Sequence, residues 1–159
     1  MNTITTLFGF AGATAAFVLV VPIALGKIDR WRHDRTDGVE KWFHDENMPA
    51  ELRKATLYMN EQPISLQSPV RLNGQVDQVY RKRNGLLVLV DTKTRARHRV
   101  YDSDIYQLSL YALILSMGRK EKVSGKAYVR TVIRTPTSRF VRYHKVRLIP
   151  SGALLRQLR

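Results

Sequence analysis

The sequence predicts an α/β protein, with a single N-terminal transmembrane helix followed by a domain of strands and helices. Three observations predict this fold class. Residues 4–25 carry no charge, residues 70–92 contain two strand-like runs joined by an Asn-Gly turn, and residues 105–116 have apolar side chains at helical spacing. A chain of 159 residues has room for one compact domain beside such a helix.

The first 26 residues are predicted to form a transmembrane anchor. Their uncharged run, residues 4–25, reaches about 33 Å as a helix, which is enough to cross a bilayer core of about 30 Å. A cleaved signal peptide is the alternative interpretation, because residues 13–15 (Ala-Thr-Ala) resemble a small-residue cleavage site. However, the segment before that site has no Lys or Arg, and the apolar sequence continues beyond it. The uncleaved anchor is therefore favoured.

The charges that flank the anchor predict its orientation. No Lys or Arg precedes it, whereas Lys27, Arg30 and Arg32 follow it directly. The positive-inside rule therefore predicts a single-pass protein of the inner (plasma) membrane, with its C-terminal domain in the cytoplasm. Small residues four positions apart, such as Gly9 and Ala13, also allow two anchors to pack closely, which hints at dimerisation.

Residues 27–48 are mixed in charge and predict a juxtamembrane linker, which leaves residues 49–159 for the domain. The chain has 27 Lys and Arg against 13 Asp and Glu, a formal charge of +14, and every charged side chain lies after Gly26. From residue 105 to residue 159 there are 12 basic side chains and one acidic side chain, Glu121. Such an excess predicts a polyanionic partner, either nucleic acid or an anionic membrane surface. The absence of cysteine excludes disulfides and thiolate metal sites.

The domain is predicted to run in the order helix, three strands, helix and two strands. The helices are expected at residues 49–59 and 105–116, and the strands at residues 64–67, 70–81, 86–92, 126–134 and 140–148. Asn47 as a cap and Pro49 in the first turn favour the start of the first helix, and Pro63 ends it. The Asn-Gly turn at residues 84–85 favours a hairpin, because both residues tolerate positive φ. The run 86–92 is apolar on both faces, which is typical of a central strand.

Three charged side chains interrupt the apolar pattern of the two hairpin strands. Asp77 lies in the first strand, and Asp91 and Lys93 close the second. Because side chains alternate along a strand, Asp91 and Lys93 share one face. Two carboxylates on paired strands can hold Mg²⁺, and a neighbouring lysine can orient or deprotonate a bound water, or stabilise negative charge on a phosphate. A simple ion pair at a strand end is the alternative, and composition alone favours neither interpretation.

Three short motifs occur in order around these residues. They are GxxD at residues 74–77, DxK at residues 91–93 and QxxxY at residues 107–111. In this order, with a hairpin between the first two and a helix carrying the third, they resemble the RecB-type branch of the PD-(D/E)XK nuclease superfamily over roughly residues 50–148. The resemblance implies a mixed sheet flanked by helices, in agreement with the element order expected from the residues themselves.

The resemblance also implies roles for individual residues. Asp77 and Asp91 would be ligands of Mg²⁺ or Mn²⁺, with the carbonyl of Thr92 as a further ligand. Lys93 would join the two carboxylates as a catalytic residue. Many relatives carry a His or Glu on the helix before the first of these strands. Glu61 is the nearest acid here, which makes it a candidate for the metal shell, and a solvated carboxylate is the alternative for it.

Four further residues are candidates for contacts with nucleic acid. Gln107 and Tyr111 lie one helical turn apart, and the resemblance implies that they contact the nucleic-acid backbone or brace the site. Core packing is an equal alternative for Tyr111. Arg95 and Arg97 directly follow the candidate catalytic lysine, where they would add positive charge beside the site.

Together these features predict a membrane-anchored, Mg²⁺-dependent nuclease that hydrolyses phosphodiester bonds of DNA on the cytoplasmic side. One alternative is a catalytically inactive module of the same fold that binds nucleic acid at the membrane. Another is that the basic surface contacts anionic lipid, at about 1 kcal/mol for each Lys or Arg near the membrane. The sequence contains no base-reading helix or zinc-finger motif, so nothing in it predicts sequence-specific recognition.

Overall fold

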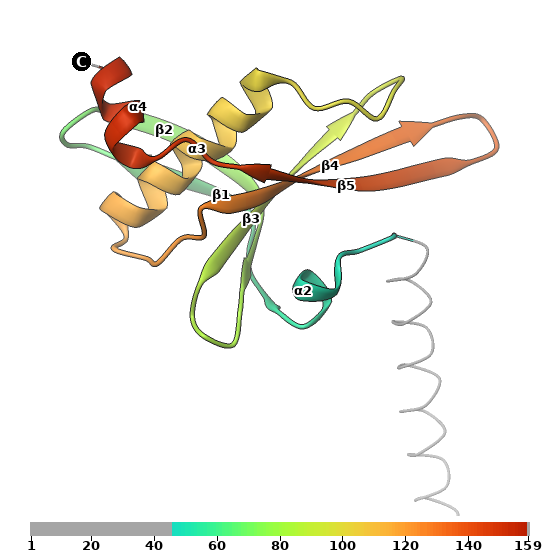
Figure 1. Ribbon diagram of the computed structural model, residues 1–159, viewed down its shortest axis with the longest axis horizontal. Coiled ribbons are helices and arrows are strands. Elements are labelled where there is room, and N and C mark those ends of the chain that lie inside the picture. The colour runs from blue at the N-terminus through green and yellow to red at the C-terminus, as the bar shows by residue number, and fades with distance from the viewer. Residues whose placement is uncertain (1–45, 159) are drawn as a thin grey trace, which may run out of the picture. The chain divides into compact units, whose positions relative to one another are not determined.

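The computed structural model describes residues 46–158, which lie within one compact unit. Its helices are α2 (Ala50–Arg53), α3 (Asp102–Gly118) and α4 (Ser151–Gln157), and its strands are β1 (Thr56–Leu66), β2 (Leu72–Arg81), β3 (Leu87–Thr94), β4 (Lys126–Arg134) and β5 (Arg139–Arg147) (Figure 1). The predicted order of helix, three strands, helix and two strands is confirmed, and a further helix, α4, follows it.

The five strands form one sheet in the order β1-β2-β3-β4-β5, with β3 at its centre as predicted. Neighbouring strands are antiparallel except β3 and β4, which are parallel and are connected through α3. A parallel pair needs such a crossover connection, whereas β2 and β3 are joined by a short turn in which Gly85 has a φ of +80°. The predicted mixed sheet flanked by helices is therefore confirmed.

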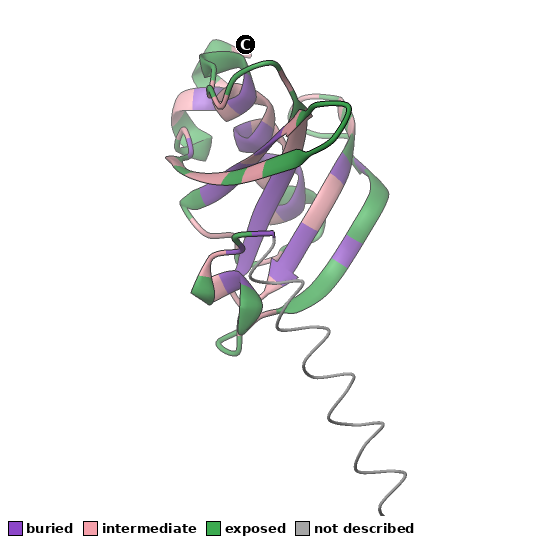
Figure 2. Ribbon diagram, turned by 90° about the vertical axis from the view of Figure 1, so that its right-hand side faces the viewer, coloured by how far each residue is buried: buried purple, intermediate pink, exposed green. Residues whose placement is uncertain are grey.

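The two faces of the sheet are covered differently. On one face α3 packs against β1, β2 and β3, and buried side chains such as Leu89, Leu113 and Leu154 form the larger core. On the other face, Met48 and Leu52 from α2 and the residues before it pack against aromatic and valine side chains of the sheet. Figure 2 shows buried residues gathered along the central strands. A strand covered on both faces is apolar on both, which is why the sequence identifies β3 as central.

The predicted first helix, residues 49–59, is wrong in its second half. α2 ends at Arg53, and β1 begins at Thr56 and pairs with β2 along its whole length. Pro63 lies inside β1, because an edge strand has one backbone side without ladder bonds and so tolerates proline. The predicted strand 64–67 is the end of this longer strand. Long-range pairing with β2 has overridden a local helical pattern.

α4 is an element that the sequence analysis did not predict. It begins after Pro150, and its Leu154 is fully buried in the larger core. A helix of seven residues spans about two turns, so its apolar side chains are too few to show helical periodicity.

The predicted fold class needs a correction in its membrane part. Within residues 46–158 no helix is long and apolar enough to cross a membrane. The longest of them, α3, has 17 residues, or about 26 Å of helix, and carries Asp102 and Asp104 in its first turn. The predicted transmembrane helix of residues 4–25, with the anchor of residues 1–26 and most of the linker, lies outside the described residues. The fold that the structure supports is the mixed α/β sheet domain alone.

Candidate active site

The site begins where β3 changes its pairing partner. β3 pairs with β2 through its first half and with β4 through its second half. The ladder between β2 and β3 ends at the pair Gln78 and Val90, and Asp77 and Asp91 are the next residues along the two strands. The N–H of Thr92 donates a hydrogen bond to Asp77 Oδ2 at 2.7 Å, so a side chain takes the place of the next ladder bond. Both predicted carboxylates therefore lie at this fork between diverging strands.

Asp91 is a buried carboxylate with incomplete compensation of its charge. Its exposed fraction is 2%, and Lys93 Nζ lies 3.0 Å from Asp91 Oδ2, as the alternation along β3 predicts. The contact is an ion pair and not a well-directed hydrogen bond, and Oδ2 has no hydrogen-bond partner among the described residues. Burial raises the pKa of Asp91, Lys93 opposes that effect, and the carboxylates of Asp77 and Asp104 add to it. Such an environment favours a bound cation.

Lys93 is held by α3 as well as by Asp91. Its Nζ donates a hydrogen bond to Gln107 Oε1 at 2.9 Å, and Gln107 Nε2 donates to the hydroxyl of Tyr111 at 2.7 Å. The Tyr111 ring lies against Gly74 of β2 so closely that a Cβ atom there would be 2.4 Å from ring carbon Cε1. The three sequence motifs are thus joined by direct contacts, and each holds the next in place.

The backbone of Gly74 has a role that the sequence analysis did not assign. A side chain at this position would displace the Tyr111 ring, and with it the partner of Gln107. A glycine on a strand and an aromatic residue on a later helix can form such a contact. However, Gly74 and Tyr111 are 37 positions apart, and no sequence pattern shows that these two residues pair with each other.

The two predicted arginines have different surroundings. Arg95 makes a bidentate ion pair with Asp104 of α3, at 2.6 and 2.8 Å, and also donates to the carbonyl of Arg99. Burial acts to raise the pKa of Asp104, but Arg95 and the N–H of Tyr101 outweigh it and lower that pKa. Arg95 therefore fastens the loop of residues 95–101 to α3, whereas Arg97 is exposed on that loop.

The same loop is attached to β4 through a threonine that is paired with Lys93 in the sheet. Thr131 lies opposite Lys93 in the ladder between β3 and β4 and is fully buried. Its hydroxyl lies 2.7 Å from His98 Nδ1 and 2.9 Å from His144 Nε2. Burial, with the charges of Arg142 and His98, lowers the pKa of His144. The loop thus rests on β4 beside the site.

Glu61 lies on β1 across from Asp77, between the ladder pairs Asn60–Gln78 and Gln62–Val76, but no ion pair of the described residues includes its carboxylate. It is exposed on β1, with a φ of +49°, and its carbonyl accepts a hydrogen bond from Gln75 Nε2 at 3.3 Å. In residues 46–158 no three Asp, Glu, His or Cys side chains come together to hold a metal ion. Direct contacts join Asp77 to the Thr92 backbone and Asp91 to Lys93, whereas Glu61 is a neighbour of Asp77 through the β1–β2 ladder alone.

Residues 12–152 of the chain match the PD-(D/E)XK nuclease superfamily. The chain belongs to this superfamily. The match identifies the superfamily and does not identify a branch within it. Superfamily membership agrees with the mixed sheet of the described domain.

Two solved structures resemble this PD-(D/E)XK chain at low identity. One, the crystal structure of SSO0001, is 15% identical with a TM-score of 0.41, and the match covers 90% of this chain and 64% of that protein. The other, a protein of Eubacterium rectale described as a "putative exonuclease", is 12% identical with a TM-score of 0.48, and the match covers 96% of this chain and 65% of that protein. This chain thus spans slightly less than two thirds of either protein. No curated protein matches it.

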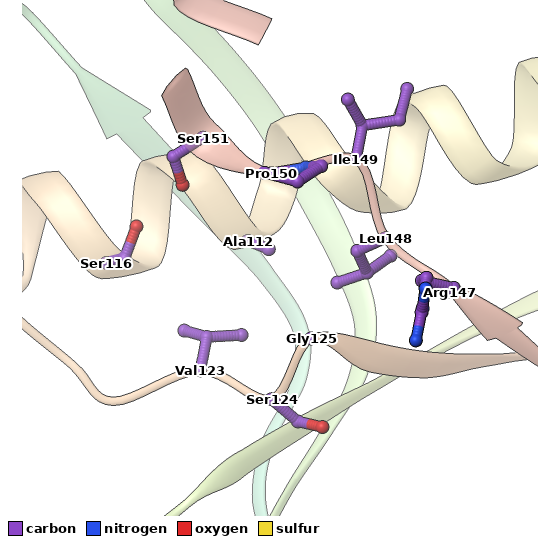
Figure 3. Close-up of a pocket in the computed structure, with 10 residues that line it drawn as sticks. All are labelled: Ala112, Ser116, Val123, Ser124, Gly125, Arg147, Leu148, Ile149, Pro150 and Ser151. Atoms are coloured by element: carbon purple, nitrogen blue, oxygen red, sulfur yellow. The ribbon is translucent and has the colours of Figure 1, made fainter. Parts of the chain in front are cut away.

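Two pockets of the described domain lie outside the carboxylate site. One is formed by α3, residues 123–125 and the connection from β5 to α4 (Figure 3). The other borders Gln107 and Tyr111 on α3 and includes Asn73 of β2. Neither is lined by Asp77, Asp91 or Lys93.

Proposed function

We propose that this protein is a RecB-type nuclease that hydrolyses phosphodiester bonds of DNA with Mg²⁺ or Mn²⁺. The observation that carries the proposal is the group of Asp77, Asp91 and Lys93 at the fork between β2 and β3, with Lys93 held by Gln107. Membership of the PD-(D/E)XK superfamily supports nuclease activity in general. The order of the GxxD, DxK and QxxxY motifs supports the RecB-type assignment, and the excess of basic residues supports a polyanionic substrate.

The residues of the fork are suited to a divalent cation. Asp91 Oδ2 is buried without a hydrogen-bond partner among the described residues, and Asp77 adds a second negative charge close by. With these two carboxylates and the carbonyl of Thr92 as ligands, the remaining positions would belong to water, which Mg²⁺ commonly retains. A bound ion of this kind polarises the scissile phosphate and lowers the pKa of a water molecule.

The contribution of the chain itself is to position one ammonium group. Lys93 Nζ has three donors, of which Gln107 Oε1 takes one and Asp91 Oδ2 lies near another. Another donor is therefore available to a phosphate oxygen, where the ammonium can stabilise the negative charge that develops during hydrolysis. Tyr111 and Gly74 fix the side chain of Gln107 and so keep the ammonium aimed at the fork.

The proposal is tested by cleavage of DNA by the full chain with Mg²⁺ or Mn²⁺. We expect Asp77→Asn and Lys93→Met each to lower the rate of cleavage by about 10²-fold or more, because each removes charge from the reacting centre. Lys126→Met is the matched control, because Lys126 is exposed at the start of β4, and it should cleave at the rate of the unmodified protein. A protein that binds DNA with either metal ion but never cleaves it would instead be the inactive binding module.

A further inference from the structure

The two faces of β5 differ in what surrounds their basic side chains. On one face, Arg139 is paired with Glu46 and Lys145 with Glu51, so acids from the N-terminal part of the described domain neutralise them. On the other face lie Phe140 and Arg142, which we call the β5 strip. Among residues 46–158 no acid forms an ion pair with Arg142.

The β5 strip lies on the same face of the sheet as the candidate active site. Lys93 is paired with Thr131 across β3 and β4, and Thr131 is paired with Arg142 across β4 and β5. Residues opposite one another in a ladder share a face, and strands are about 4.8 Å apart, so Arg142 is about 10 Å from Lys93 at the level of the backbone. Phe140 lies two residues further along the strip, opposite Ile133.

The strip is open to solvent where the helices stop. α3 packs on β1, β2 and β3, and the hairpin of β4 and β5 extends away from α3 and α4 (Figure 1). Phe140 has an exposed fraction of 54%, which is the highest among the exposed large apolar side chains of the described domain. Arg97 and Arg99 are also exposed, on the loop that rests on β4 through His98. An exposed aromatic ring thus lies two residues from Arg142, which no acid of the described residues neutralises, on the face that carries the candidate active site.

An aromatic ring beside arginines is the combination that binds single-stranded nucleic acid. The ring stacks on an unpaired base, and the guanidinium holds the neighbouring phosphate. In a duplex the base faces are covered by their neighbours, so a ring on an open strand has no base to stack on. An anionic lipid surface would use the arginines, but it would not require their alignment with Lys93 across the ladder.

We propose that the β5 strip binds single-stranded DNA, with Phe140 stacked on a base and Arg142 on a phosphate, and leads the strand past the loop of residues 95–101, which covers Thr131, to the active site. This inference rests on the proposed nuclease function, because it names the form of substrate that the same site receives. It makes the protein a nuclease for unpaired strands or frayed ends.

The test is the binding of the full chain to a fluorescent oligo(dT) of about 16 nucleotides, the upper end of single-strand site sizes, in buffer with EDTA. We expect Phe140→Leu to weaken binding about five- to 150-fold, the range for loss of one stacked base, and Phe140→Trp to restore it. Duplex DNA should bind equally to all three proteins. Arg142→Ala should lower the slope of log K against log salt by about 0.7, as expected for one phosphate contact on a single strand.

The matched control is Arg147→Ala, because Arg147 is exposed on the same strand but on the opposite face. It should change the binding of oligo(dT) less than Arg142→Ala does. The inference is wrong if Phe140→Leu binds oligo(dT) as tightly as the unmodified protein, or if the two arginine variants are equal. It is also wrong if Phe140→Leu weakens binding only to phosphatidylserine vesicles, which would make the strip a lipid contact.

Because binding is measured without metal, its outcome is separate from that of the cleavage test. A protein that loses oligo(dT) binding with Phe140→Leu but never cleaves DNA supports the strip and contradicts the nuclease. A protein that cleaves DNA while Phe140→Leu binds normally supports the nuclease and contradicts the strip.

Discussion

Two carboxylates on opposite faces of the sheet, Asp91 and Glu51, have opposite environments. Glu51 accepts hydrogen bonds from Lys145 and Lys82, each at 2.5 Å, and from the hydroxyl of Tyr128. These partners lower the pKa of Glu51 to about 2. Asp91 has one cation, and burial raises its pKa. The same chemical group is thus fully compensated on one face and only partly compensated on the other.

This difference in charge compensation indicates that Glu51 stabilises the fold, whereas Asp91 is suited to a functional role. Glu51 lies on α2, and its partners are Lys82 just after β2, Tyr128 on β4 and Lys145 on β5, so its contacts hold the N-terminal part of the described domain on the sheet. Asp91 makes no comparable set of contacts, and its burial beside Asp77 and Asp104 costs stability in the absence of a cation. A buried carboxylate whose charge is only partly compensated is characteristic of a functional site.

The largest effect that this comparison predicts is a loss of activity with no loss of stability in Asp91→Asn. The amide removes a metal ligand, so cleavage of DNA should fall by about 10²-fold or more. It also removes a buried charge, and Lys93 keeps Gln107 as a partner, so the melting temperature in EDTA should be unchanged or higher. Cleavage assays and thermal denaturation in EDTA measure the two effects. A variant that melts well below the unmodified protein would make Asp91 a structural residue like Glu51.

An intermediate effect is predicted for Gly74→Ala, which tests whether the packing of Tyr111 on Gly74 positions Gln107 and Lys93. The new Cβ would be 2.4 Å from the Tyr111 ring, so the ring must move and Gln107 loses its partner. We expect cleavage to fall about tenfold and the free energy of unfolding to fall by about 1–3 kcal/mol, as for other overpacked sites.

The control for this variant is the same substitution in a protein that already carries Tyr111→Ala. With the ring removed, Gly74→Ala should have almost no further effect on cleavage, because residues in contact are not additive. If Gly74→Ala lowers cleavage equally in both proteins, the contact between Gly74 and Tyr111 does not position Lys93.

The active-site face was predictable from sequence because its signals are local. Alternation along β3 placed Asp91 and Lys93 on one face, and the Asn-Gly turn brought Asp77 on β2 beside them. The predicted strand of residues 126–134 also has the bounds of β4, Lys126–Arg134. Short-range rules were sufficient for Asp77, Asp91 and Lys93 because these three residues lie on one strand or across one tight turn, whereas the contact between Gly74 and Tyr111 was not predictable in this way.

The opposite face was not predictable, because its contacts join distant parts of the chain. Glu46 was assigned to the linker, yet it is 3% exposed and is paired with Arg130 and Arg139, more than 80 residues away. The predicted helix 49–59 failed for the same reason, since β1 is defined by its pairing with β2. No local pattern marks an acid whose partners lie on strands that follow it much later.

The smallest effect is predicted for Glu51→Gln, which removes a compensated carboxylate. Cleavage should be unchanged, and the free energy of unfolding should fall by about 1 kcal/mol at neutral pH, since the cluster is partly exposed to solvent. The same substitution at Glu61, which is exposed and has no ion pair among the described residues, should cost less.

The pH dependence of stability tests the contacts of the ionised Glu51 carboxylate with Lys82 and Lys145. The pKa of Glu51 is lowered from 4.5 to about 2 on folding, so its stabilisation is complete above pH 4.5 and is lost as the pH falls toward 2. Unfolding by denaturant measures the free energy of unfolding of both proteins across this range. The unmodified protein should be more stable than Glu51→Gln at pH 4.5, and this difference should disappear as the pH falls to 2. If the difference between the two proteins is the same at both ends of the range, the lysines do not stabilise the ionised carboxylate. The contrast with Asp91 would then reflect burial alone.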